Sequence, residues 1–113
     1  MKKIGVDFRF MKNLFDVVNP NPEKELVLPL YENGSVRIEH IVSDGHASPD
    51  GFWYDQDDDE WVCVLKGEAR LRFEDSEVLM RAGDQLLICA HRRHRVDYVS
   101  VDCRWLAVFS RCL

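Results

Sequence analysis

The sequence has no long hydrophobic segment and no paired cysteine motif. No run of hydrophobic side chains exceeds five residues in this chain of 113 residues, whereas a helix needs ~20 of them to cross a bilayer. The four cysteines include no CxxC pair, which is typical of reduced, buried thiols. The first residues include two lysines but no apolar signal segment. These absences predict a cytoplasmic protein with no membrane partner.

Basic residues are also few. Fifteen lysines and arginines stand against twenty acidic residues, for a formal net charge of −5. A protein that binds nucleic acid without sequence preference must neutralise phosphates, so it is normally basic. The composition therefore argues against a nucleic-acid partner, and the length fits a single domain.

Short strand-like segments fill the chain after residue 24. Apolar residues at 69, 71 and 73 alternate with charged residues at 68, 70 and 72, as expected for a strand with one buried face. Turn residues separate such segments every eight to twelve residues, which is typical of an all-β sandwich or barrel. We expect an N-terminal segment over 1–24 and a barrel over 25–113. The predicted strands cover 26–30, 36–43, 61–65, 69–73, 78–80, 85–89, 96–99 and 103–109.

The same alternation predicts which side chains form the barrel interior. His40 is in phase with Ile38 and Val42, so we expect it to point inward as a core or subunit-contact histidine rather than a ligand. Pro29 confines the first strand to an edge or a bulge. The predicted interior comprises Ile38, Val62, Val64, Leu71, Phe73, Val78, Leu86, Ile88, Val96, Leu106 and Val108.

Two spaced motifs carry the functional signal. Glu60 is followed by six residues and Gly67, and Gly83 is followed by ten residues and His94. Together these stretches resemble the two motifs of the cupin superfamily, over roughly residues 33–110. The resemblance implies a double-stranded β-helix, a jelly-roll-like barrel in one domain, with a pocket in its mouth. It also implies a homodimer, with which the aromatic N-terminal residues Phe8, Phe10 and Phe15 are compatible.

The first motif departs from the family pattern. The family's two histidine positions fall on Tyr54 and Gln56 or, in a register longer by one residue, on Trp53 and Asp55. The resemblance implies a divalent metal (Mn, Fe, Zn or Ni) with Glu60 and His94 as matched ligands. The Gln56 amide oxygen would be the third ligand, and such a set binds metal more weakly than one rich in histidine.

Three further side chains are predicted to line the pocket: Tyr54, Tyr98 and His91. Two classes of function then remain open, and neither identifies catalytic residues. One is a metal-dependent enzyme acting on a small molecule, with Tyr54 or Tyr98 as a proton donor. The other is a metal-free module that binds a small polar ligand such as a sugar or a carboxylate.

Charged clusters flank both motifs. We expect Asp57, Asp58 and Asp59 to form a solvated loop. The basic cluster Arg92, Arg93 and Arg95 either pairs with that acidic loop or attracts an anionic ligand to the pocket.

Overall fold

The computed structural model describes residues 9, 11–16 and 18–111, and the regular structure in this part of the chain is all β. The predicted all-β class and each predicted strand are confirmed, with most strands extended by a few residues. The strands are β1 (Leu26–Glu32), β2 (Val36–Ser43), β3 (Asp58–Lys66), β4 (Glu68–Phe73), β5 (Glu77–Arg81), β6 (Gln85–Ile88), β7 (His94–Val99) and β8 (Cys103–Arg111).

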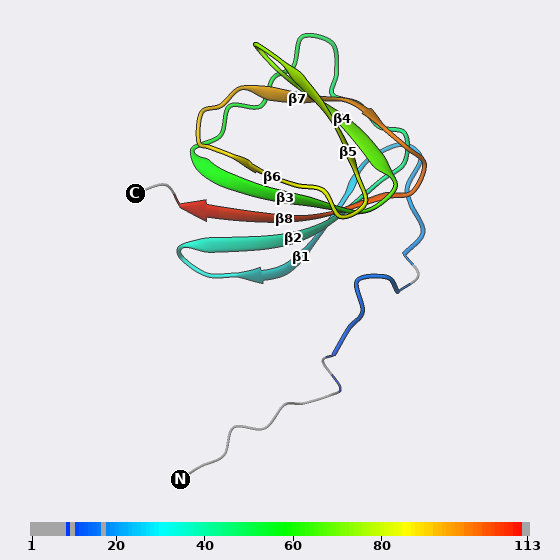
Figure 1. Ribbon diagram of the computed structural model, residues 1–113. Coiled ribbons are helices and arrows are strands. Elements are labelled where there is room, and N and C mark those ends of the chain that lie inside the picture. Colours follow the sequence, from blue (N-terminus) through cyan, green and yellow to red (C-terminus); the bar gives the residue numbers. More distant parts are fainter. Residues whose placement is uncertain (1–8, 10, 17, 112–113) are drawn as a thin grey trace.

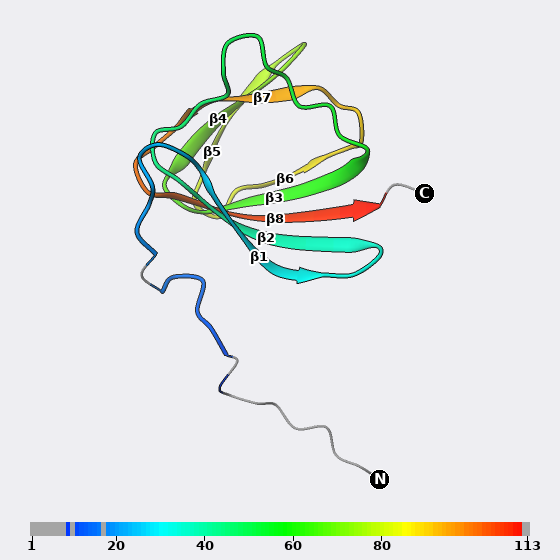
Figure 2. The same ribbon diagram turned by 180° about the vertical axis from the view of Figure 1, so that it is seen from behind.

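Two antiparallel sheets face each other and form the barrel (Figures 1 and 2). The larger sheet has the order β1-β2-β8-β3-β6, and the smaller has the order β5-β4-β7. The long pairings of β8 with both β2 and β3 place strands that are distant in the sequence side by side. Side chains on the inner faces therefore come from every part of the folded chain.

Local sequence features fix the irregular points of the larger sheet. Pro29 cannot donate a backbone hydrogen bond, and the pairing of β1 with β2 shifts register between Pro29 and Tyr31 on the outermost strand.

The prediction of a solvated acidic loop is wrong for Asp58 and Asp59, which are half-buried at the start of β3. The reason is a specific contact: the carboxylate of Asp59 accepts a hydrogen bond of 2.7 Å from the Ala90 backbone N–H.

The core lies between the two sheets. Among the predicted interior residues, Val62, Val64, Leu71, Phe73 and Ile88 belong to the buried cluster, and Leu86 and Val96 pack against it. Val78 is 36% exposed, so its assignment to the interior is wrong.

The phase of two strands differs from the prediction. On β8, Trp105 belongs to the buried cluster, and both Trp105 and Phe109 line the pocket. The predicted residues Leu106 and Val108 belong to neither group. A continuous apolar run carries no alternation, so the sequence could not decide its inner face. On β2, Glu39 and Ile41 line the interior pocket. The neighbouring residues Ile38, His40 and Val42 lie on the opposite face by the period of two.

Arg104 joins the N-terminal segment to the larger sheet. Its guanidinium is buried and donates hydrogen bonds to the backbone carbonyls of Asp16 (3.1 Å) and Val18 (3.0 Å).

Phe8 and Phe10 lie outside the described residues, while Phe15 is 61% exposed. The homodimer and the cytoplasmic location stay predictions. Within the part of the chain that the structure describes, there is no helix capable of crossing a membrane.

Acid is expected to weaken this fold through His40. The side chain is buried, and its pKa is lowered from 6.5, first by burial and then by the positive charge of Arg104. The folded state therefore takes up this proton less readily than the unfolded chain, and stability falls as the pH drops below 6.5. One such proton adds a slope of at most about 1.4 kcal/mol per pH unit.

Replacing His40 by glutamine should therefore flatten the loss of stability between pH 7 and pH 5. Urea unfolding of the wild type and His40→Gln across this range measures the effect. Parallel pH profiles for the two proteins would contradict it.

Candidate functional site

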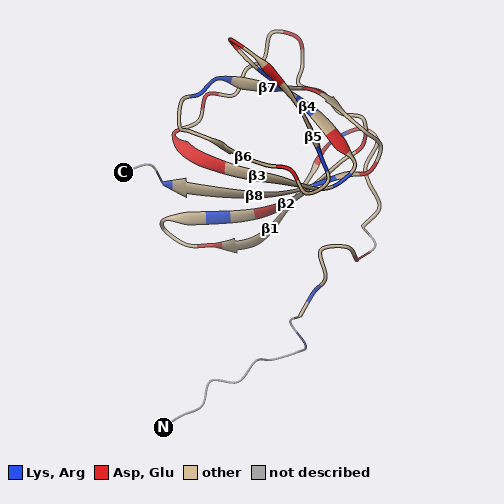
Figure 3. Cartoon of the chain, in the orientation of Figure 1, with Lys and Arg blue, Asp and Glu red and all other residues tan. Residues whose placement is uncertain are grey.

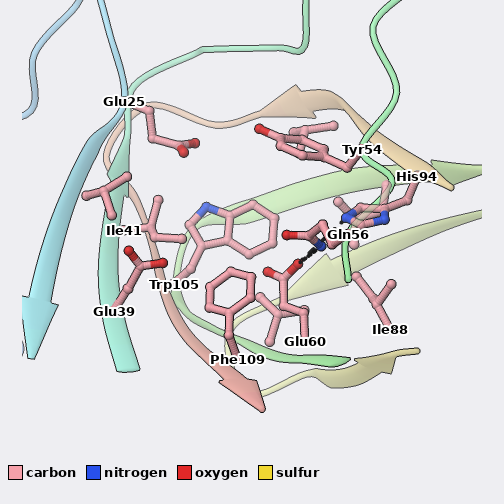
Figure 4. Close-up of a pocket in the computed structure, with 14 residues that line it drawn as sticks. Glu25, Glu39, Ile41, Tyr54, Gln56, Glu60, Ile88, His94, Trp105 and Phe109 are labelled. Atoms are coloured by element: carbon pink, nitrogen blue, oxygen red, sulfur yellow. Dashed lines mark hydrogen bonds and ion pairs between the residues drawn. The ribbon is translucent and has the colours of Figure 1, made fainter. Parts of the chain in front are cut away.

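One cavity of about 220 Å³ lies between the sheets. Its walls come from β1 and β2 on one side, from β3, β6 and β8 below, and from the smaller sheet and the loop before β3 above (Figure 4). The volume is smaller than the ~300–1,000 Å³ of most drug-sized ligand sites. The pocket therefore suits a small molecule.

A polar trio occupies one end of the pocket. Glu60 projects from β3, and His94 from the first position of β7. Their closest side-chain atoms, His94 Nε2 and Glu60 Oε1, are 3.6 Å apart. The Gln56 amide donates a 3.0 Å hydrogen bond to the same carboxylate oxygen (Figure 4). The structure thus brings together the three residues that the motifs predict as metal ligands.

His94 is held from both sides of its ring. Its Nδ1 lies 2.9 Å from the Arg92 backbone carbonyl, which can only accept, so Nδ1 carries a proton and Nε2 faces Glu60. Burial alone lowers the pKa of His94, but the Glu60 carboxylate and the Arg92 carbonyl outweigh it and raise the pKa above 6.5. The trio is therefore an ion pair supported by an amide whenever His94 is protonated.

Tyr54 covers this trio from the loop before β3. Its backbone forms a two-way bridge to His94, with hydrogen bonds of 2.7 and 3.1 Å, and its ring stacks on the imidazole at 5.2 Å between centroids. Burial, followed by the negative charges of Glu25 and Glu60, raises the pKa of Tyr54. The phenol thus stays a hydrogen-bond donor at neutral pH.

The geometry selects one of the two possible registers. Tyr54 and Gln56 line the pocket, which corresponds to the shorter spacing before Glu60. Asp55 is on the outside, where its carboxylate lies 2.7 Å from His91 Nδ1. Trp53 lies beneath the guanidinium of Arg93.

His91 and Tyr98, also predicted in the pocket, do not line it. The His91 side chain is 64% exposed and faces Asp55. Tyr98 is turned outward by a β-bulge: Leu71 pairs with Val96 and Arg70 with Tyr98, so Asp97 is the extra residue. For this reason, assigning every second residue after His94 to the inner face gives the wrong face for Tyr98.

Three polar pocket residues were not predicted from the sequence: Glu25, Glu39 and Trp105. A correct phase for β2 and β8 would have found Glu39 and Trp105. Glu25 lies just before β1, where no pattern in the sequence marks it.

The basic cluster does not face the pocket. Arg92 pairs with Asp75 at 3.1 Å and Arg93 with Glu74 at 3.0 Å, so the expected pairing with the acidic stretch before Trp61 is wrong. Figure 3 shows acidic residues at the start of β3 and basic residues leading into β7 at the same end of the barrel. The three arginines of the cluster pair instead with Asp75, Glu74 and Asp97.

The side chains fit a metal ion poorly. Across the described residues there is no group of three or more histidine, cysteine, aspartate or glutamate side chains that could hold one. Glu60 and His94 supply two ligands, whereas protein sites for zinc use three or four. The third position is an amide whose nitrogen is turned to Glu60, and the family's other histidine position is Tyr54.

Comparison with known proteins places the chain among small β-barrels. The family model described as "Cupin domain" matches residues 40–109. A comparison with curated proteins found no match. A candidate mannose-6-phosphate isomerase of Ralstonia eutropha JMP134 has 42% identity, with 90% of this chain and 98% of that chain covered and a TM-score of 0.86.

More distant structures share the fold alone. A cupin superfamily protein of Desulfitobacterium hafniense DCB-2 has 20% identity and a TM-score of 0.73, with 84% of each chain covered. KdgF from Halomonas sp. has 15% identity and a TM-score of 0.68, with 79% of this chain and 82% of that chain covered.

Proposed function

The chain belongs to the cupin domain family, and we propose that its pocket binds a small polar molecule without a resident metal ion. The observation that carries the proposal is the trio of Gln56, Glu60 and His94. In it the carboxylate already has a hydrogen-bond donor at 3.0 Å and a facing imidazole at 3.6 Å. Such a group is satisfied without a cation, and it can still offer its second oxygen to a ligand.

The surroundings of the trio support ligand binding. Tyr54, Trp105 and Phe109 give the pocket aromatic walls, and Val62, Leu71 and Ile88 add apolar surface from both sheets. A concave, mostly apolar site with a few placed polar groups is the usual form of a small-molecule site. Fold alone does not identify the ligand, because one fold supports many activities.

Metal analysis together with ligand binding tests the proposal. Protein purified without an affinity tag should contain far less than one equivalent of Mn, Fe, Ni or Zn. D-Mannose and mannose 6-phosphate serve as probes by calorimetry, and at least one should bind. Glu60→Gln should weaken that binding about tenfold or more, because hydrogen bonds to charged groups contribute about 1.5–3 kcal/mol.

Glu74→Gln is the matched control, since Glu74 is exposed and pairs with Arg93 outside the pocket. One tightly held metal per chain, or binding that is indifferent to Glu60, would overturn the proposal.

A second candidate function is sugar isomerisation. The 42% identical protein carries that description, and the pocket has groups that could move a proton: Tyr54 as a donor, and Glu60 with His94 as a carboxylate–imidazole pair. Incubation of each sugar in D₂O, followed by proton NMR, tests this function. Deuterium entering the carbon next to the carbonyl would support it, and an unchanged spectrum would leave binding as the function.

A further inference from the structure

The end of the pocket opposite His94 holds a second set of polar groups. Figure 4 shows the Glu25 carboxylate and the Tyr54 hydroxyl facing each other across the cavity. The indole nitrogen of Trp105 lies at this same end of the cavity. Glu25 immediately precedes β1, Tyr54 lies in the loop before β3, and Trp105 lies on β8. None of them belongs to the trio around Glu60.

Trp105 is the informative member of this set. The residue is only 5% exposed, and its Nε1 has no hydrogen-bond partner in the described part of the protein. A buried N–H without a partner is uncommon and costs free energy. Because the side chain lines the cavity, a ligand oxygen can supply the missing acceptor.

Glu25 differs from Trp105 because its carboxylate needs a hydrogen-bond donor or a cation from the ligand. Its carboxylate accepts a 2.9 Å hydrogen bond from Ser43 Oγ, and no lysine, arginine or histidine among the described residues forms an ion pair with it. The pocket's other two carboxylates differ, because Glu39 pairs with Arg37 at 3.3 Å and Glu60 faces His94. Within the part of the chain that the structure describes, this end of the pocket therefore holds a carboxylate without a cationic partner and an N–H without an acceptor.

Few chemical groups can both accept a hydrogen bond from the Trp105 N–H and lie next to the Glu25 carboxylate. An ammonium group could face Glu25 but could not accept from Trp105, whereas a phosphate or carboxylate could accept but would meet the like charge of Glu25. A hydroxyl group accepts one hydrogen bond and donates another. We propose that this end of the pocket recognises a hydroxyl of an uncharged polyhydroxylated ligand, such as an unphosphorylated sugar or polyol. This inference rests on the proposed binding function.

Among the described residues, no lysine or arginine lines the pocket, so none there provides a phosphate site. Arg92 and Arg93 are engaged with Asp75 and Glu74 on the outside, and Arg95 donates to Asp97 and to backbone carbonyls of the loop before β3. Arg37 does contact pocket residues with its side chain, but it pairs with Glu39 at 3.3 Å and lies over Phe109. A phosphorylated ligand would therefore meet net negative charge.

NMR can test this proposal because the chain has only three tryptophans, Trp53, Trp61 and Trp105. Their indole N–H signals are assigned by single replacement with phenylalanine. Titration with D-mannose should move the Trp105 signal and leave the Trp61 signal in place. Mannose 6-phosphate and mannosamine, the anionic and cationic counterparts, should bind at least about tenfold more weakly.

Two variants test the individual contacts. Trp105→Phe keeps an aromatic ring but removes the donor, and it should weaken mannose binding about fivefold to tenfold. Trp61→Phe is the matched control, because the Trp61 indole donates to Gln85 at 2.9 Å away from the pocket. Glu25→Gln removes the charge, so it should narrow the preference for mannose over mannose 6-phosphate.

The outcomes separate this inference from the proposed function. Preferential binding of mannose 6-phosphate or of mannosamine by the wild type would overturn the inference. It would leave the proposed function intact, provided that binding depends on Glu60. Mannose affinity unchanged in Trp105→Phe, or no mannose binding at all, would also overturn the inference. The metal content decides the metal-free part of the proposed function independently.

Discussion

Replacing Tyr54 and Gln56 together by histidine is expected to raise the affinity of the pocket for Zn(II) by at least about a hundredfold. Both side chains line the pocket beside Glu60 and His94, so the double variant brings four ligating side chains to one point. Even an outer partner of a metal ligand is worth about 10–100-fold in affinity, and a ligand in direct contact with the metal should contribute more. Titration against a competing chelator measures the change.

The single variant Gln56→His should give a smaller gain, because it adds only one imidazole. Its metal affinity should fall steeply below about pH 6.5, since imidazole must lose its proton to coordinate. Asp55→His is the control: Asp55 lies outside the pocket against His91, so its replacement should leave Zn(II) affinity unchanged. A gain from Asp55→His, or none from the double variant, would show that the register is wrong.

Gly67→Ala is expected to destabilise the fold by about 2–4 kcal/mol. Gly67 has a φ of +82°, a conformation that costs residues with a Cβ about 1–2 kcal/mol. A Cβ there would also lie 2.5 Å from Ser100 Oγ and 3.1 Å from the Cys103 backbone. Ser100 Oγ accepts a hydrogen bond from the Glu68 backbone N–H, so it cannot move away without loss.

The variant Gly83→Ala separates the cost of backbone strain from the cost of a steric clash. Gly83 has a similar φ of +92°, but a Cβ there would have no atom within 4 Å. This variant should lose only about 1–2 kcal/mol, the cost of the conformation alone. Urea unfolding of both variants gives the difference, and equal losses would contradict the role assigned to Ser100 and Cys103.

Most of the fold could be predicted from the sequence because its strands are short and bounded by turn residues. The strand around Leu71 has a clear alternation of apolar and charged residues, and its inner face was predicted correctly. The strand containing Trp105 is apolar on both faces near its middle, so its phase could only be settled by tertiary packing.

The site was predictable only in part, for a related reason. The motif spacing identified Glu60 and His94, and the shorter of its two registers placed Tyr54 and Gln56 beside them. Spacing within the motifs says nothing about Glu25, which enters the pocket from the segment just before β1.

The bulge at Asp97 has a consequence for how this protein tolerates changes in length. Its carboxylate lies 2.6 Å from Arg95 Nε and 2.7 Å from Arg72 Nε, so the extra residue is anchored to its own strand and to the neighbouring one. Deleting Asp97 would leave Leu71 opposite Val96 and Arg70 opposite Tyr98 in an uninterrupted ladder, so Tyr98 would stay outside and Val99 inside. The deletion would cost the two arginine contacts but would turn no side chain to the other face. This strand should therefore accept the loss of one residue at position 97, whereas the loss of one residue at any other point would reverse the faces of the side chains beyond it.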